Sequence, residues 1–196
     1  MSTAETAPET QLVRPRRADA RRNYEKVLAA AREAFAEGGE STALEEIARR
    51  AGVGIGTLYR HFPNRQALLE AVYVGEVEAV CRTAEELEDA EPWDALRGWL
   101  ERLVGYIATK QALLGELTNY LAPDAPLFAT CRASLYGAGE PLLARAQEAG
   151  VVRSDVTVAD LIQMVVGLAK LPAGDPDRVQ HILGIALDGL RYTGPS

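Results

Sequence analysis

The chain has 196 residues, of which 47% are hydrophobic and 25% charged, and its formal net charge at pH 7 is −7. This length and composition suit one or two globular domains with a sizeable core. No apolar run approaches the roughly 18 residues of a transmembrane helix, and the amino terminus has no apolar signal segment. The sequence therefore predicts a cytoplasmic protein with no membrane partner.

Residues 1–20 are polar, contain proline and have no hydrophobic periodicity, so we predict a disordered basic arm. Arginines gather at its end and just beyond it: Arg14, Arg16, Arg17, Arg21 and Arg22. A flexible basic arm can follow a phosphate backbone or enter a minor groove. A tail that only keeps the protein in solution is an equally good interpretation.

Charge is distributed unevenly along the chain. Residues 14–69 carry 11 basic and 7 acidic side chains, whereas residues 70–196 carry 10 basic and 19 acidic ones. The amino-terminal part is therefore suited to nucleic acid although the whole chain is acidic. The acidic remainder is expected to stay away from phosphates.

Apolar spacing predicts a first helix over residues 23–37 and a second that begins at Thr42. Thr42 is the expected N-cap, and Glu45 is expected to reach back to it in a capping box. Gly52 ends the second helix, and the glycines of residues 53–56 allow a sharp turn.

A third, short helix is predicted over residues 57–62 and is stopped by Pro63. Two short helices joined by a tight turn are typical of a helix-turn-helix, in which the second helix enters the major groove of DNA. The candidate DNA contacts, whose side chains or backbone suit phosphates and base edges, are Thr42, Gly56, Thr57, Tyr59, Arg60, His61 and Arg65. A helical hairpin in an ordinary bundle is the alternative.

Residues 47–69, IARRAGVGIGTLYRHFPNRQALL, resemble the DNA-binding domain of the TetR family of bacterial transcriptional repressors, and the resemblance covers about residues 23–72. It implies that Thr57, Tyr59 and His61 contact double-stranded DNA. It also implies that Arg65 takes the position of a lysine that is usual in the family.

Three positions depart from the family pattern. Ala43 stands where a second threonine is frequent, Glu45 where a basic residue often reaches DNA, and Gly54 where a serine cap is frequent. The resemblance does not carry those three contacts over to this chain.

The remaining pattern is helical throughout, with no alternation typical of strands. Further helices are predicted over residues 66–89, from 92 to about 107, and over 111–121, 126–149, 158–171 and 176–190. The prediction is an all-α fold of about nine helices, with a helix-turn-helix domain over residues 21–65 and a second domain over 66–196.

The last two predicted helices carry wide apolar stripes with small residues among them. The residues predicted to form a homodimer interface are Leu161, Val165, Val179, Ile182, Leu183, Ala186, Leu187 and Leu190. A twofold dimer doubles the contacts of one helix-turn-helix and recognises a palindromic operator, and the resemblance implies a four-helix dimer bundle. The alternative is that the stripe faces the protein's own core, as part of it must.

The resemblance also implies a small-molecule effector site in the second domain. Its candidate lining residues, large or adaptable side chains, are Trp99, Leu103, Tyr106, Tyr120, Phe128, Tyr136 and Met164. Each of them also fits a plain core. Glu76 and Glu116 are acidic groups that could favour a cationic effector, but solvated helix faces explain them better.

Catalytic and metal-binding motifs are missing from the sequence, so we predict neither an enzyme nor a cofactor or metal. Cys81 and Cys131 have no metal-ligand spacing and are expected to be small buried groups, with a redox pair left open. The predicted function is a ligand-responsive homodimeric repressor. The alternatives are a sequence-nonspecific architectural DNA binder, which the acidic second domain disfavours, and a helical ligand-binding or adaptor protein without specific DNA binding.

Overall fold

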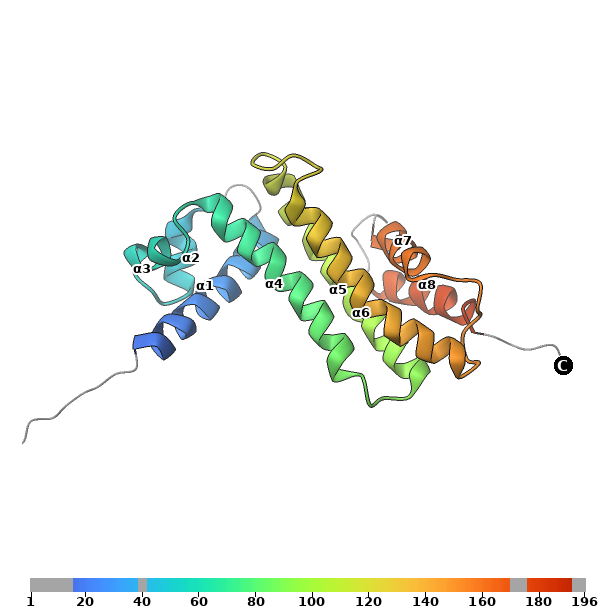
Figure 1. The fold of residues 1–196 in the computed structure, drawn as a ribbon. Helices are drawn as coiled ribbons and strands as arrows, with labels where there is room; N and C mark the ends of the chain where they lie inside the picture. Colours follow the sequence, from blue (N-terminus) through green and yellow to red (C-terminus); the bar gives the residue numbers. More distant parts are fainter. Residues whose placement is uncertain (1–15, 39–41, 170–175, 192–196) are drawn as a thin grey trace, which may run out of the picture.

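The computed structural model describes residues 16–38, 42–169 and 176–191. Within these ranges the fold is all-α, as predicted. Val152 and Arg191 form an isolated antiparallel β-bridge. In the described ranges, three helices form the amino-terminal end of the molecule, and five others form the rest (Figure 1).

The first helix, α1, runs from Arg16 to Gly38 and so begins earlier than predicted. Residues 1–15 of the predicted arm lie outside the described residues, but residues 16–20 are helical, and for them the prediction of disorder is wrong. Ion pairs one helical turn apart, Arg22 with Asp19 and Arg21 with Glu25, stabilise this end of the helix.

Helices α2 (Leu44–Arg50) and α3 (Ile55–His61) pack against α1. The helices meet through fully buried apolar side chains, among them Val27, Phe35, Ile47 and Leu58. This small core fixes the angle between α2 and α3 and leaves one face of α3 exposed.

The predicted capping box at the start of α2 is wrong. The N-cap is Ala43, which makes no side-chain cap hydrogen bond. The hydroxyl of Thr42 donates instead to the carbonyl oxygen of Ala34, at 3.0 Å. Thr42 therefore ties the start of α2 to α1 instead of capping α2.

The turn between α2 and α3 is shorter than predicted. Gly52 has a φ of +66°, a left-handed conformation that favours glycine, and the N–H of Val53 donates to the carbonyl of Ala48 at 3.0 Å. Gly54 has an ordinary φ of −70° and serves as the N-cap. One left-handed residue completes the reversal, so α3 begins at Ile55 and not at Thr57.

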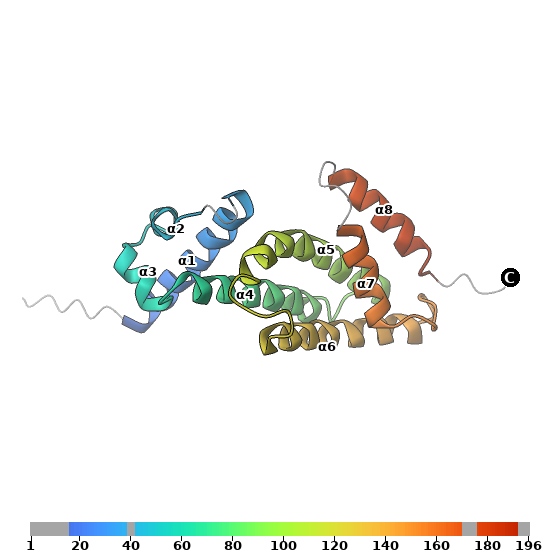
Figure 2. The same cartoon turned by 90° about the horizontal axis from the view of Figure 1, so that it is seen from above.

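Helix α4 (Arg65–Glu86) leads away from the amino-terminal helices, with the side chain of Asn64 accepting a hydrogen bond from the N–H of Ala67 as its cap. It packs against α5 (Pro92–Leu117) and α6 (Pro126–Glu148). Seen from above, α4, α5 and α6 form one bundle beyond the amino-terminal helices (Figure 2).

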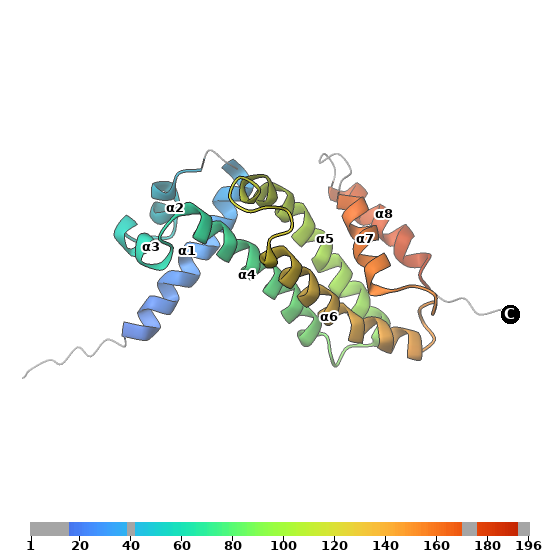
Figure 3. The ribbon, with the colours of Figure 1, turned by 45° about the horizontal axis from the view of Figure 1, so that its top comes forward.

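Helices α7 (Val158–Ala169) and α8 (Pro176–Asp188) complete the fold at the end of the molecule away from α3 (Figure 3). Helix α7 packs on α5 and α6, and α8 packs on α7 and α5. The amino-terminal helices and α8 are thus joined through the α4–α6 bundle.

The predicted break between residues 107 and 111 is absent, because α5 is continuous to Leu117. Tyr106, Leu113 and Leu117 are all buried and are separated by whole helical turns. No glycine or proline interrupts residues 106–114, so nothing in the sequence ends the helix there.

Gly139 of α6 lies directly against the ring of Trp99 of α5, which is fully buried. A β-carbon built at Gly139 would lie 2.4 Å from Cη2 of Trp99, so the glycine allows the two helices to approach closely.

We expect Gly139→Ala to lower the free energy of unfolding by about 1–3 kcal/mol, because the added methyl group overpacks this contact. The matched control is Gly137→Ala on the same helix, where an added β-carbon meets nothing within 4 Å. That change should raise stability by up to about 1 kcal/mol, since alanine is the better helix former. Equal effects of the two substitutions in urea unfolding would contradict the packing described.

Candidate DNA-binding surface and effector cavity

Helix α3 presents a polar, partly basic face to solvent. Tyr59 is 45% exposed, Arg60 is exposed, and Thr57 is half-buried beside them. Leu58 and Phe62 point the other way, into the small core. The predicted recognition residues of α3 are therefore accessible on one short helix, while the apolar residues between them hold it in place.

The end of α3 is supported by Tyr24 of α1. The Tyr24 ring stacks on that of Phe62, with centroids 5.0 Å apart, and meets the edge of His61 at 5.9 Å. His61 is half-buried as a result. Tyr24 was missed by the sequence analysis because its spacing on α1 places it outside the buried stripe.

Ile55 is a second residue that the sequence analysis missed. It is 37% exposed and lies in the first turn of α3. It was assigned to the turn because the helix was predicted to begin two residues later. An apolar side chain at this place on a recognition helix suits the methyl group of a thymine.

The basic residues of α2 are held in ion pairs. Arg49 and Arg50 both donate to the carboxylate of Glu46, and Arg50 also donates to Glu37 of α1, at 2.7–2.8 Å. The two arginines lower the pKa of Glu46 to about 2. Arg60 of α3, by contrast, forms no ion pair within the described residues. Its guanidinium therefore remains available to an anion.

Arg65 points into the protein. Its guanidinium donates to Oε2 of Glu116 at 2.9 and 2.5 Å and to the carbonyl of Thr42, and it lies 5.0 Å from the centre of the Phe35 ring. This placement departs from the prediction that Arg65 contacts DNA. Arg65 instead joins the start of α4 to the end of α5.

The two acidic residues considered for a cationic effector are both buried. Glu76 and Glu116 are each 3% exposed, so the interpretation as solvated faces is wrong. Because a buried carboxylate needs a charged partner, each is paired with an arginine, Glu116 with Arg65 and Glu76 with Arg32 of α1. Arg102 of α5 lies 3.7 Å from Glu76. The Arg65–Glu116 pair thus joins α4 to α5, and Glu76 of α4 joins α1 and α5 through Arg32 and Arg102.

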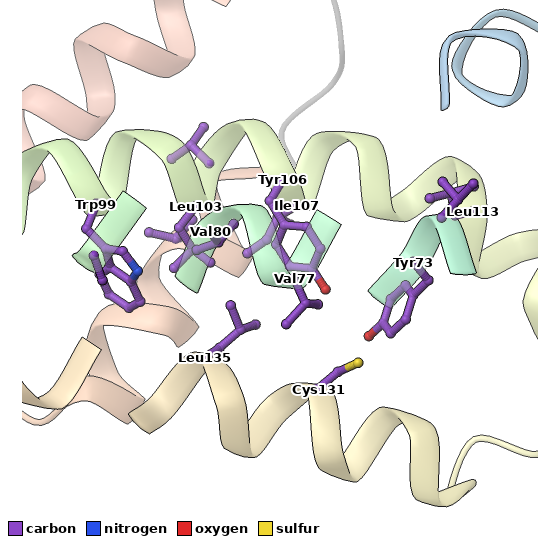
Figure 4. Close-up of a cluster of buried hydrophobic side chains, with 14 of the residues drawn as sticks. Tyr73, Val77, Val80, Trp99, Leu103, Tyr106, Ile107, Leu113, Cys131 and Leu135 are labelled. Carbon is purple, nitrogen blue, oxygen red and sulfur yellow. The ribbon is translucent and has the colours of Figure 1, made fainter. Parts of the chain in front are cut away.

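A cavity of about 580 Å³ lies among α4, α5, α6 and α7. Of the predicted effector-site residues, its lining includes four, which are Leu103, Tyr106, Phe128 and Tyr136. The side chains of α5 and α6 in this region point toward one another (Figure 4). The volume falls within the usual range for small-molecule sites, about 300–1,000 Å³.

Three predicted residues do not line this cavity. Trp99 is buried against Gly139, Tyr120 is 46% exposed beyond the end of α5, and Met164 packs at the edge of the core. Their size and apolarity suited a pocket, but the sequence does not reveal which face of each helix meets its neighbours.

Lys110 and Arg132 are the charged residues of this lining. The Lys110 ammonium lies 5.6 Å from the centre of the Tyr73 ring and 5.7 Å from that of Tyr106. Burial, and secondarily the nearby charge of Arg132, lowers the pKa of Lys110. Burial also raises the pKa of Tyr106, as does the neighbouring phenol of Tyr73.

A second cavity, of about 800 Å³, lies between α4 and α6 and includes both cysteines. Cys131 is buried and Cys81 half-buried, and both are free thiols. Burial raises the pKa of each thiol. No cluster of metal-ligating side chains occurs in the described part of the chain.

Two family models match this chain. Residues 27–72 match the model of bacterial regulatory proteins of the tetR family, and residues 91–192 match the model described as the carboxy-terminal domain of SbtR-like transcriptional regulators. The second match alone covers more than half of the chain. The chain belongs to the TetR family.

Solved structures of other TetR-family regulators resemble this one over nearly their whole length. A regulator from Streptomyces coelicolor, SCO0520, is 38% identical with a TM-score of 0.78, covering 87% of this chain and 99% of that one. One from Mycobacterium vanbaalenii is 37% identical with a TM-score of 0.76, covering 91% and 100%. The transcriptional regulator UidR of Escherichia coli is 37% identical over 65 residues, a match that spans only about a third of either protein.

The predicted dimer stripe of this TetR-family chain mostly faces its own core. Five of its residues are buried within the single chain: Leu161, Val165, Leu183, Leu187 and Leu190. Val179, Ile182 and Ala186 are half-buried. The surface of α8 carries a residue that the sequence analysis left out, Ile185, which is 60% exposed.

Among the described helices, none has the length and apolar character that a membrane span requires.

Proposed function

We propose that this TetR-family protein is a homodimeric repressor that binds a palindromic operator and is released from it by a small-molecule effector. The exposed face of α3 carries this proposal, because Thr57, Tyr59 and Arg60 form an accessible polar ridge on a helix of the size that enters a major groove. Within that ridge Arg60 is the candidate base contact, since a guanidinium pairs with two acceptors of a guanine.

The proposed release mechanism uses the buried ion pairs. Lys110 in the cavity and Glu116 at the junction lie on the same helix, about 9 Å apart along its axis at 1.5 Å per residue. A ligand that shifts this part of α5 would move Glu116 and, through it, Arg65 at the start of α4. The effector relieves repression to the extent that it prefers one of the two positions.

The dimer is proposed to form through the outer face of α8. Ile182, Ile185 and Ala186 lie on one side of that helix, and Ile185 is largely exposed in the single chain. The three apolar side chains together make a patch on one helix face, and such a patch suits association with a second copy of the chain.

We expect Ile185→Glu to convert the dimer to a monomer in analytical ultracentrifugation, because it places a charge in the apolar interface. The control is Gln180→Glu, an exposed position on the same helix. A dimer that survives Ile185→Glu at micromolar concentration would exclude this face.

Selection of bound duplexes from a random DNA library tests the proposed function. The expected result is a palindromic motif whose half-sites are one helical turn apart, about 34–36 Å, or a multiple of it. An enriched motif without twofold symmetry would exclude the dimeric reading, and no enrichment at all would favour the adaptor alternative.

A further inference from the structure

The cavity among α4–α7 is positively charged within an acidic domain. Residues 70–196 carry 19 acidic and 10 basic side chains, yet the cavity lining includes Lys110 and Arg132 and no carboxylate. Lys110 is half-buried and Arg132 is exposed, and Arg132 is close enough for its charge to act on Lys110. Two like charges near one another repel each other, and an anion between them relieves that repulsion.

Neither cation is neutralised by the protein. Within the described residues no carboxylate lies within ion-pair distance of Lys110 or Arg132, whereas the buried acidic groups nearby, Glu76 and Glu116, are already paired with other arginines. The rings of Tyr73 and Tyr106 give the Lys110 ammonium a partial compensation. The positive charges of Lys110 and Arg132 are therefore not balanced by a negative charge in the lining.

A buried hydroxyl in the lining also lacks a well-formed hydrogen bond. Tyr106 is 1% exposed, and its hydroxyl lies beside the phenol of Tyr73, but the two do not meet in the geometry of a normal hydrogen bond within the described structure. A buried hydroxyl without a satisfied hydrogen bond is unfavourable, so a ligand oxygen that accepts a hydrogen bond from it gains affinity. The hydroxyl belongs to the same residue whose ring faces the Lys110 ammonium.

Most of the remaining lining is apolar and includes Leu103, Ile107, Phe128, Leu135 and Val166, although Thr118 and Gln163 are also part of it. Such walls favour an apolar or aromatic body, and the volume of about 580 Å³ admits a ligand of two or three rings.

We propose that this cavity binds an amphipathic organic anion, with its acidic group between Lys110 and Arg132, one of its oxygens accepting from Tyr106, and its apolar body against α5, α6 and α7. The inference rests on the proposed function insofar as the anion is taken to be the effector. The binding site itself stands independently of DNA binding.

Two fluorescent probes with the same apolar body test the proposal. 8-Anilinonaphthalene-1-sulfonate carries an acidic group, and N-phenyl-1-naphthylamine is the same molecule without it. We expect the wild-type protein to bind the sulfonate more tightly than the neutral probe in a fluorescence titration. Equal affinity for the two probes, or no binding of the sulfonate, would overturn the proposal.

Variants locate the site. Lys110→Met and Arg132→Met are each expected to weaken sulfonate binding by about tenfold, as expected for loss of a charged partner, and to leave binding of the neutral probe unchanged. The matched control is Arg82→Met, which removes a cation from the lining of the other cavity. An unchanged preference for the sulfonate in the first two variants, or its loss in Arg82→Met, would contradict the assignment.

Operator binding by the wild-type protein, measured without either probe, separates the two proposals. A protein that binds the sulfonate at Lys110 but selects no DNA motif would retain the anion site and lose the repressor assignment. A protein that selects a palindrome but binds both probes with equal affinity would keep the repressor assignment and lose the anion site.

Discussion

Replacement of Tyr59 by alanine should weaken operator binding by about tenfold or more while leaving the oligomeric state and the melting temperature unchanged. Tyr59 is 45% exposed on the outer face of α3, so its removal leaves no cavity in the core. A side chain that meets a base or phosphate in the groove contributes about 1–3 kcal/mol, which corresponds to this loss. Fluorescence anisotropy with a selected operator measures it.

The matched control for this prediction is Tyr120→Ala. Tyr120 is 46% exposed, almost the same as Tyr59, but it lies beyond the end of α5 and away from α3. Its loss should not affect operator affinity. If Tyr59→Ala bound as tightly as the wild type, or if both variants weakened binding equally, the assignment of α3 as the recognition helix would fail.

Replacement of Glu116 by glutamine should have the largest effect on stability, lowering the free energy of unfolding by about 3 kcal/mol. The substitution leaves the Arg65 guanidinium partly buried without its charged partner, and removal of one member of a buried pair typically costs about 3–5 kcal/mol. We expect the lower end of this range because the Arg65 side chain is 20% exposed and still donates a hydrogen bond to the Thr42 carbonyl. Urea unfolding followed by circular dichroism measures the change.

The control for Glu116→Gln is Glu101→Gln on the same helix. Glu101 pairs with Arg97 on the surface at 2.8 Å, with both side chains well exposed. Such a pair contributes at most about 1 kcal/mol. A double-mutant cycle with Arg65→Met tests the pairing itself, since the two single losses should not add. Additive losses would show that the residues act independently and would remove them from the proposed release mechanism.

The all-α fold and the helix-turn-helix could be predicted because they depend on local patterns. Apolar residues at helical spacing placed Val27, Ile47 and Leu58 on the buried faces of their helices, where the structure has them. The reversal at Gly52 was likewise readable from the residue type, since a left-handed φ favours glycine.

Side-chain partners across the fold could not be predicted, because they depend on how distant helices approach each other. From the sequence alone, Thr42 could either cap its own helix or form a hydrogen bond with α1. The position of the Ala34 carbonyl in the fold determines that it bonds to α1. Likewise, an arginine at the start of α4 looks free to meet DNA until Glu116, 51 residues away, is brought beside it.

The apolar stripes of α7 and α8 show the same difficulty. Periodicity identifies the residues that leave water, but it does not distinguish burial in the chain's own core from burial against a second copy. Leu161, Val165 and Leu183 are covered by the chain itself. Ile185, which we propose as a dimer contact, falls outside the most regular part of the stripe and could be identified only from its exposure.

The central claim is that α3 presents a surface that recognises a particular DNA sequence. Its most direct test is the ratio of the affinities of the purified protein for a selected duplex and for a shuffled duplex of the same composition, at modest ionic strength. We predict a preference of about a thousandfold or more, as sequence-specific regulators show. Equal affinities, in a sample whose circular dichroism retains full helical content, would contradict the claim.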